Sequence, residues 1–441
     1  MRFTNNSIHP KNVFRAFKYR NYRLYFGGQG ISLIGTWMQR IAMGWLVYRL
    51  TNSTFLLGFV VFLSALPMLF ITPFAGVLID RMNRFQIILW MQILATIQAL
   101  GLWLLVITHT IQIWHIIALS VFLGLVNAFD MPARQSFVIE MVDKKEDLGN
   151  AIAMNSTMFN GARLIGPTVA GILIASAGEG VCFLVNAISF FAVIIGLLLM
   201  KVKEHKIEPQ KSHIFKEMKQ GFHYTFSFMP IRSIILLLAL ISIMGMPYAV
   251  LMPVFAGQIL HGGPQTLGFL MGSAGVGAII GALYLASKKT VFGLDRIIPI
   301  SAAIFGIGII TFAVSRMFLL SALFMTLVGF GMMVQMASSN TVVQTIIDDD
   351  KRGRVMSFYT MAFIGTAPFG SLLAGSVASK IGAPNTLIIS GAFCILGAII
   401  FIKELPEIHK HIRPIYIKMG IIPEVASGIQ TASQLTTPPE D

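Results

Sequence analysis

The chain has 441 residues, of which 55% are hydrophobic and only 12% are charged. Because a water-soluble domain carries roughly 25% charged residues, this composition excludes an ordinary soluble protein. The net charge of +14 would suit a nucleic-acid ligand, but the positions of the basic residues, described below, exclude that interpretation.

The chain begins with a basic segment, residues 1–23, ahead of the first apolar run. This segment lacks the short apolar core and the cleavage site of a secretory signal. Aromatic residues alternate with basic residues from Phe14 to Arg23, a pattern typical of an anchor at a membrane surface. We expect the segment to be cytoplasmic.

Twelve apolar runs follow, each close to the length of about 20 residues that crosses the hydrocarbon core. In lipid, only a helix satisfies its own backbone amides within one segment, and these runs are too long and too uniformly apolar for barrel strands. The sequence therefore predicts an all-α integral membrane protein with twelve transmembrane helices. The predicted spans are residues 24–49, 55–79, 85–108, 112–131, 149–177, 180–200, 231–257, 265–287, 294–314, 317–341, 354–379 and 384–402.

Basic residues are concentrated in alternate loops between these spans, and therefore on one side of the membrane. With the N terminus inside, the cytoplasmic segments and the inner ends of the spans hold 28 of the 33 Lys and Arg residues, which follows the positive-inside rule. This asymmetry predicts that both termini are cytoplasmic and supports an even number of spans. It also accounts for the net charge without a nucleic-acid partner.

Polar residues recur along the first predicted span every three to four positions, at Gln29, Ser32, Thr36 and then Gln39 or Arg40, and Met43 follows at the same spacing. This spacing places them on one helix face, which cannot lie against lipid. We therefore expect the stripe to line a central pathway. Arg40 lies about 24 Å from the inner end, at 1.5 Å per residue, so the alternative for this residue is snorkelling to the outer headgroups.

The loop after the second span, Gly76–Arg84, reads GVLIDRMNR. It resembles the loop signature of the major facilitator superfamily, in which Gly is followed four residues later by Asp and then by basic residues. Asn83 stands where a second Gly is usual. The resemblance implies a cytoplasmic gate in which the Asp faces the positive start of the eleventh span; the alternative is a solvated loop acid. The implied gate residues are Gly76, Asp80, Arg81, Arg84, Gly353 and Arg354.

The fourth span carries Asp130 and Arg134 one helical turn apart, a spacing that favours an ion pair. Proton antiporters commonly use a carboxylate deep in the membrane, and Asp130 is the candidate in this chain. A pair with Arg134 would lower its proton affinity. We take these two residues as possible coupling residues.

The fifth span contains Gly161, Gly166, Pro167 and Gly171. The pattern resembles the antiporter signature that the superfamily associates with export. Glycines allow a neighbouring helix to approach closely, and Pro167 leaves one backbone carbonyl unpaired and bends the helix. The alternative is ordinary close packing.

Arg163 lies close to the midplane on the same span, together with Asn155. A lone charge at that depth costs at least about 2.5 to 3.5 kcal/mol, so Arg163 needs a partner or water. We favour a cavity with excess positive charge that receives an anionic cargo. The alternative is a structural Arg163 bonded to backbone carbonyls.

A hydrophilic linker, residues 201–230, separates two sets of six spans, residues 24–200 and 231–403. Short matches recur between the sets at offsets of 204 to 210 residues, including Leu57-Gly58-Phe59 with Leu267-Gly268-Phe269 and Ala170-Gly171 with Ala374-Gly375. They predict two pseudo-symmetric six-helix bundles from a duplicated unit. Residues 404–441 are too polar to bury and are predicted to form a flexible cytoplasmic tail.

The seventh and tenth spans are rich in methionine and also carry the amide of Gln335. Flexible thioethers suit a pathway for bulky ligands, so we place Met244 and Gln335 in the expected cavity; apolar packing is the alternative. The methionines concerned are Met244, Met246, Met252, Met332, Met333 and Met336.

Longer stretches resemble one branch of the superfamily, which contains bacterial enterobactin exporters and macrolide efflux proteins. They are GTWMQ at 35–39, FDMPARQ at 129–135, MNSTMFNGARLIGP at 154–167 and RGRVMS at 352–357. The resemblance implies a secondary transporter that exports a siderophore-like or amphipathic compound across the bacterial inner membrane by alternating access, working as a monomer. Alternatives are multidrug or macrolide efflux, lysophospholipid transport, and a non-transporting scaffold or sensor.

Other functional classes find no support in the sequence. A primary pump would need a phosphate-binding loop, which is absent, and a membrane enzyme would need paired acids, a Ser/His arrangement or metal ligands. We therefore expect no catalytic residue, no cofactor and no metal. Cys182 and Cys394 both lie in apolar runs and give no disulfide framework.

Overall fold

The computed structural model describes residues 14–79, 82–142, 144–201, 214–288, 290–348 and 351–421, and all its regular elements are helical. Eleven segments within these ranges are long and apolar enough to cross a membrane. The remaining predicted span, residues 24–49, lies within helix α2 (Arg20–Thr51), whose polar and charged side chains lower its hydropathy. The predicted all-helical, multi-span membrane protein is confirmed.

The N-terminal half consists of α2 and five further long helices, with one short 3-10 turn before α2 and another between α5 and α6. These elements are η1 (Arg15–Lys18), α3 (Thr54–Ile79), α4 (Arg84–Ile107), α5 (Ile113–Phe137), η2 (Val138–Met141), α6 (Lys145–Ala177) and α7 (Glu179–Leu198).

A linker helix, α8 (Ile214–Ser227), leads into the C-terminal half. This half consists of α9 (Met229–Leu240), η3 (Ile241–Gly245), α10 (Tyr248–Val254), η4 (Phe255–Ile259), α11 (Pro264–Ala286), α12 (Leu294–Val314), α13 (Phe318–Ile346), α14 (Arg352–Thr360), η5 (Met361–Gly365), α15 (Ala367–Ile381) and α16 (Ala383–Lys418). The segments η3, η4 and η5 are π-helical turns that interrupt the predicted seventh and eleventh spans. Such turns are frequent at functional sites.

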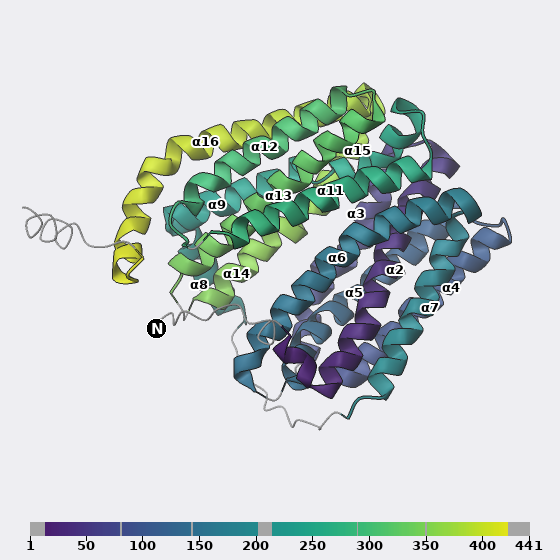
Figure 1. The fold of residues 1–441 in the computed structure, drawn as a ribbon, viewed down its shortest axis with the longest axis horizontal. Helices are drawn as coiled ribbons and strands as arrows, with labels where there is room; N and C mark the ends of the chain where they lie inside the picture. The colour runs from purple at the N-terminus through teal and green to yellow at the C-terminus, as the bar shows by residue number, and fades with distance from the viewer. Residues whose placement is uncertain are drawn as a thin grey trace, which may run out of the picture.

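The two halves form separate helix bundles that diverge toward the end of the molecule where α8 lies, as Figure 1 shows. We call this the α8 end, and the other the opposite end. One large apolar cluster joins the C-terminal half to the N-terminal half near the opposite end, where it includes Leu57 and Ile174. At the α8 end the N-terminal half has its own cluster, which includes Tyr22 and Phe137. The halves are therefore packed together mainly near the opposite end.

Two glycine crossings hold the halves together at the opposite end. A Cβ atom added to Gly375 of α15 would lie 2.6 Å from the carbonyl oxygen of Thr54 in α3, and the Thr54 hydroxyl donates to the Gly375 carbonyl at 3.2 Å. A Cβ atom added to Gly171 of α6 would lie 2.9 Å from the Cα atom of Gly268 in α11. Only glycine allows backbones to approach this closely.

The crossings join residues that the internal repeat relates to each other. Gly58 and Gly268 are one matched pair, and Gly171 and Gly375 are the other. In the structure Gly58 lies against Gly375 and Gly171 against Gly268. The same contact is thus made twice, once from each copy of the duplicated unit.

The C-terminal tail begins later than the sequence predicted, because helix α16 is longer than the predicted last span. It continues through Lys418, beyond the predicted start of the tail at residue 404. Ile408, Ile412 and Tyr416 are all buried against the C-terminal half, because their spacing of four residues gives the polar segment one apolar face. Residues 422–441 lie outside the described part of the chain.

Candidate functional site

Side chains from both halves gather around Trp37 of α2. The guanidinium carbon of Arg40 lies 4.6 Å from the centre of the indole ring, and that of Arg163 lies 6.0 Å from it. The ring of Phe159 packs edge-on at 5.8 Å. We name the Trp37 cluster for these residues and two from the C-terminal half: Trp37, Arg40, Phe159, Arg163, Tyr248 and Met332.

Arg163 connects the two halves near the middle of the helices. Its Nη2 lies 3.5 Å from the sulfur of Met332, which is midway along α13, and its guanidinium is close enough to the hydroxyl of Tyr248 in α10 to interact with it electrostatically. Within the described ranges, no carboxylate forms an ion pair with Arg163. Asp130, the acid expected nearest in depth, is paired with Arg134 instead.

The cluster has the properties of an anion site. Arg40 and Arg163 approach the same indole without a neutralising acid among the described residues. Two neighbouring cations, of which Arg163 is partly buried, produce a positive potential that an anion would relieve. The aromatic rings and Met332 add apolar surface that adapts to a ligand of irregular shape. An organic anion with an apolar portion complements this arrangement.

The polar stripe on α2 does not face the other half throughout, contrary to expectation. Gln39 accepts a hydrogen bond from the Asn186 amide at 2.7 Å and donates to Gln98 at 2.9 Å. Gln98 in turn donates to the carbonyl of Leu119 at 3.2 Å. Gln39 therefore bridges α2, α4 and α7 within the N-terminal half. Helical spacing places residues on one face but does not say which neighbour covers that face.

The other stripe residues are spread over different surroundings. Gln29 and Ser32 are buried, and the Gln29 side-chain oxygen has no hydrogen-bond partner among the described residues. The Thr36 hydroxyl donates to the Ser32 carbonyl at 2.9 Å. Arg40 alone among the five is exposed, and it belongs to the Trp37 cluster.

The remaining predicted cavity residues lie apart from the cluster or inside the packing. Asn155 accepts a hydrogen bond from the Tyr22 hydroxyl at 3.0 Å, which ties α6 to α2. Gln335 is buried and donates to Ser339 on its own helix at 3.2 Å. Met244 packs against the large apolar cluster from η3. Their roles as cavity residues stay predictions.

Asp130 and Arg134 form the expected ion pair on α5. Asp130 also accepts a hydrogen bond from the amide of Gln92 in α4 at 2.9 Å. Gln92 Oε1 and Arg134 Nη1 are buried without a hydrogen-bond partner in the part of the chain that is described. Unpaired buried polar atoms are costly, so the group has the capacity to bind water.

The described part of the predicted gate shows open space at its two glycines. Cβ atoms added to Gly76 and Gly353 would meet nothing within 4 Å. Arg84 pairs with Glu140 at 2.8 Å within its own half, and the stem of Arg354 lies against Gly221 of α8. Asp80 and Arg81 lie outside the described residues. The gate therefore stays a prediction.

The antiporter-type residues have three different environments. A Cβ atom added to Gly166 would lie 2.5 Å from the Cβ atom of Trp37, so α6 and α2 touch there. Gly171 forms the crossing with α11, whereas Gly161 faces open space. Pro167 lies inside α6, which continues through it. Close packing accounts for Gly166 and Gly171; a bending role stays a prediction.

Sequence reasoning missed Trp37 and Tyr248. Trp37 lies one turn before Arg40, and this spacing could have indicated a cation–aromatic contact. Nothing in the sequence near Tyr248 indicates contact with Arg163, because the two residues belong to different halves.

A family model described as transmembrane secretion effector matches residues 12–418. The chain belongs to this family of major facilitator transporters. It is therefore a multi-pass membrane protein and a secondary transporter of small molecules, not an enzyme. This membership agrees with the two-bundle fold and with the sequence resemblance.

Curated relatives of the chain are transporters. It is 26% identical over 387 residues to the staphyloferrin A transporter of Staphylococcus aureus, covering 87% of this chain and 96% of the relative. It is 23% identical over 396 residues to macrolide efflux protein A of Streptococcus pyogenes, with the same coverage of 87% and 96%. It is also 23% identical over 398 residues to the multidrug efflux pump Tap of Mycolicibacterium fortuitum, with 88% and 95% covered.

Solved structures share the fold. A bacterial homologue of the iron transporter ferroportin in an inward-facing state superposes with a TM-score of 0.66 at 18% identity, covering 88% of this chain and 98% of that one. A bacterial homologue of the lysosomal transporter Spinster superposes with a TM-score of 0.67 at 12% identity, with 92% and 99% covered.

Proposed function

We propose that the chain exports a small anionic, siderophore-like compound from the cytoplasm of a bacterial cell by alternating access. The observation that carries the proposal is the Trp37 cluster, where Arg40 and Arg163 approach one indole from a single half while Tyr248 and Met332 meet Arg163 from the other. A ligand between the halves would couple its binding to their relative position.

The direction and the charge of the cargo have separate support. Basic residues predominate at the α8 end, which on the positive-inside rule is the cytoplasmic side. The halves diverge there (Figure 1), so a cytoplasmic compound would have access to the Trp37 cluster. The relatives include a siderophore transporter and efflux proteins. The two guanidinium groups favour a carboxylate-bearing compound over a cation.

Transport by Arg163 variants tests the proposal. Staphyloferrin A and a macrolide would each be offered to the purified protein in proteoliposomes, with and without a pH gradient. We expect the anion to be carried, and Arg163→Gln to lower its rate at least about tenfold, since losing a charge-assisted contact costs roughly 1.5–3 kcal/mol. Arg163→Lys should retain part of the rate because it keeps the charge.

Arg316→Gln is the matched control. Among the described residues, Arg316 hydrogen-bonds only the nearby backbone carbonyls of Ala313 and Ser315, at the opposite end. Its loss should leave the rate within about twofold of the parent. If Arg163→Gln carried the anion as fast as the parent, the role of the cluster in cargo binding would be wrong.

Efflux of an amphipathic drug is the second candidate function. Phe159, Trp37 and Met332 give the cluster an apolar side, and two of the relatives are efflux proteins. Transport of the macrolide but not of the anion, unaffected by Arg163→Gln, would favour it. A scaffold or sensor would carry neither compound, and a lysophospholipid offered in the same assay tests the remaining alternative.

A further inference from the structure

The last helix is much longer than a membrane span. α16 has 36 residues, whereas about 20 residues cross the hydrocarbon core. Ile399, Ile400 and Ile402 have exposed side chains, as expected of lipid-facing residues, and the polar part of the helix begins at Lys403. Residues 403–418 therefore lie at or beyond the membrane surface, on the side of the α8 end.

This part of α16 is held against the protein and does not extend away from it. Ile408, Ile412 and Tyr416 are buried, and His409 contacts the carboxylate of Asp295 in α12. Pro406 and Pro414 lie within the helix, and Figure 1 shows α16 curving around the end of the C-terminal half. We therefore place this segment close to the lipid headgroups.

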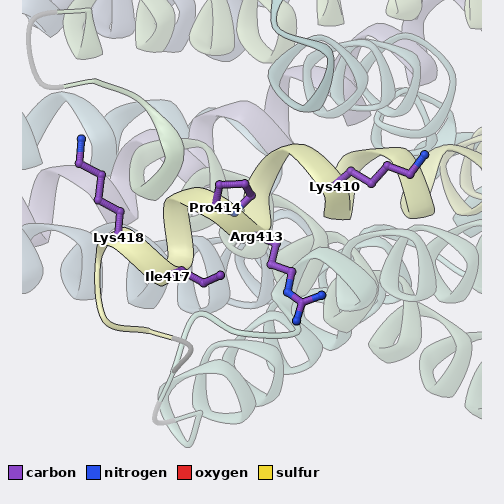
Figure 2. A pocket seen from close by; sticks show the side chains of 5 residues that line it. All are labelled: Lys410, Arg413, Pro414, Ile417 and Lys418. Carbon is purple, nitrogen blue, oxygen red and sulfur yellow. The ribbon is translucent and has the colours of Figure 1, made fainter. Parts of the chain in front are cut away.

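A shallow, open pocket of about 450 Å³, lined by this one helix, lies on the exposed face of the same segment. It is lined by Lys410, Arg413, Pro414, Ile417 and Lys418 (Figure 2). Three of these five residues are cations and none is an acid. Pro414 and Ile417 provide apolar surface between them.

Arg413 has no carboxylate partner among the described residues. Lys410 pairs with Glu407 at 2.8 Å. Lys418 is near enough to Asp348 to contribute, after Lys351, to a pKa of Asp348 below its ordinary value. The ammonium groups of Lys410 and Lys418 can bind a second anion besides the nearby carboxylate. The exposed Arg413 guanidinium can donate hydrogen bonds to an anion from outside the protein.

We propose that this pocket binds the phosphate of an anionic lipid headgroup. The planar guanidinium of Arg413 matches phosphate geometry, whereas the ammonium groups of Lys410 and Lys418 point away from it (Figure 2) and add positive potential at longer range. Pro414 and Ile417 suit the glycerol and upper acyl carbons of a lipid and would gain nothing from inorganic phosphate. Lipid bound here would fix the edge of the C-terminal half to the membrane surface. The site is separate from the Trp37 cluster and does not depend on the nature of the cargo.

Native mass spectrometry of the full chain, titrated with phosphatidylglycerol or phosphatidylcholine, tests the proposal. We expect the first phosphatidylglycerol to bind at least about tenfold more tightly than phosphatidylcholine. Attraction of about 1 kcal/mol per basic residue corresponds to about fivefold per cation. Arg413→Gln should therefore weaken it about fivefold, and Lys410→Gln/Arg413→Gln/Lys418→Gln should remove the preference.

The control removes two exposed cations at the opposite end, as Arg316→Gln/Lys380→Gln, and should change the first binding constant less than twofold. Equal binding of both lipids by the parent would overturn the proposal, as would a lipid preference that survives in the triple pocket variant. Competition by millimolar inorganic phosphate as strong as that by the lipid would identify a soluble-anion site and overturn the assignment to lipid. An unchanged melting temperature for Arg413→Gln shows that weaker binding is not misfolding.

Discussion

Buried amides in the N-terminal half bridge helices, and this explains why polar residues at similar depth have different functions. Both side-chain groups of Gln39 are hydrogen-bonded, to Asn186 and Gln98, whereas Arg40, the next residue, faces Trp37. Adjacent positions on a helix are about 100° apart, so one residue can serve the packing while the next serves a ligand.

Gln39→Leu should lower stability without changing cargo affinity. The substitution leaves the Asn186 amide and the Gln98 carbonyl oxygen without partners in a buried setting, at a cost of roughly 1–3 kcal/mol. Thermal unfolding in detergent should show a lower melting temperature, and Gln86→Leu, at an exposed position, should show little change. A normal melting temperature with a raised transport KM would contradict this and indicate that Gln39 contacts the cargo.

Asp130→Asn separates energy coupling from cargo binding. Asp130 pairs with Arg134 and accepts from Gln92, away from the Trp37 cluster, and its carboxylate is the proposed proton carrier. We expect the variant to keep exchange of cargo between the two sides while losing accumulation driven by a pH gradient. Accumulation at the parental rate would exclude Asp130 as the coupling residue.

At the scale of elements, the sequence allowed more to be predicted about helices than about their neighbours. The duplicated glycines Gly58, Gly171, Gly268 and Gly375 were recognisable because a repeat leaves matches at a fixed offset, and they meet across the halves. The stripe on α2 was assigned to the wrong neighbour at Gln39. Hydropathy reports whether a face avoids lipid, but not whether a sister helix or the other half covers it.

The same limit applies to the Trp37 cluster and to α16. Arg163 was recognisable as an unusual charge near the membrane midplane, but its proximity to Tyr248 and Met332 depends on how two separate bundles meet. The polar composition of residues 404–418 hid the four-residue spacing of their buried side chains. The average composition of this segment predicts that it is solvated. Only the four-residue spacing of its apolar side chains predicts that it packs against the rest of the protein.

Gly268→Val tests the crossing of α6 and α11. The new side chain would meet the Pro167 carbonyl, only 2.6 Å from its Cβ atom, and overpacking of this kind costs typically about 1–3 kcal/mol. Conformations open at the opposite end should become about 5 to 150 times more populated.

A cysteine reporter measures this shift. Thr168 lies within the crossing, against Gly272, so Thr168→Cys should react with an impermeant maleimide faster in the Gly268→Val background. Gly161→Ala, which adds its Cβ to open space, should leave the reaction rate unchanged. An unchanged rate in both backgrounds would mean that the crossing does not limit opening.

At the scale of the whole molecule, the contacts divide the protein into a closed end and an open end. The glycine crossings close the opposite end, and Gly76 and Gly353 face open space at the α8 end. The Trp37 cluster lies between them. Alternating access would reverse this arrangement, opening the crossings and closing the α8 end around the cargo.

Spin-label distances at both ends measure that reversal directly. Labels at Ser156→Cys and Leu283→Cys would report on the α8 end, and labels at Ser53→Cys and Ser379→Cys on the opposite end. The native Cys182 and Cys394 are 0% exposed and should not be labelled. On addition of the anionic cargo to the protein in lipid, we predict that the first distance shortens while the second lengthens, and that Arg163→Gln shows neither change. Cargo that is transported while both distances stay constant would contradict the account.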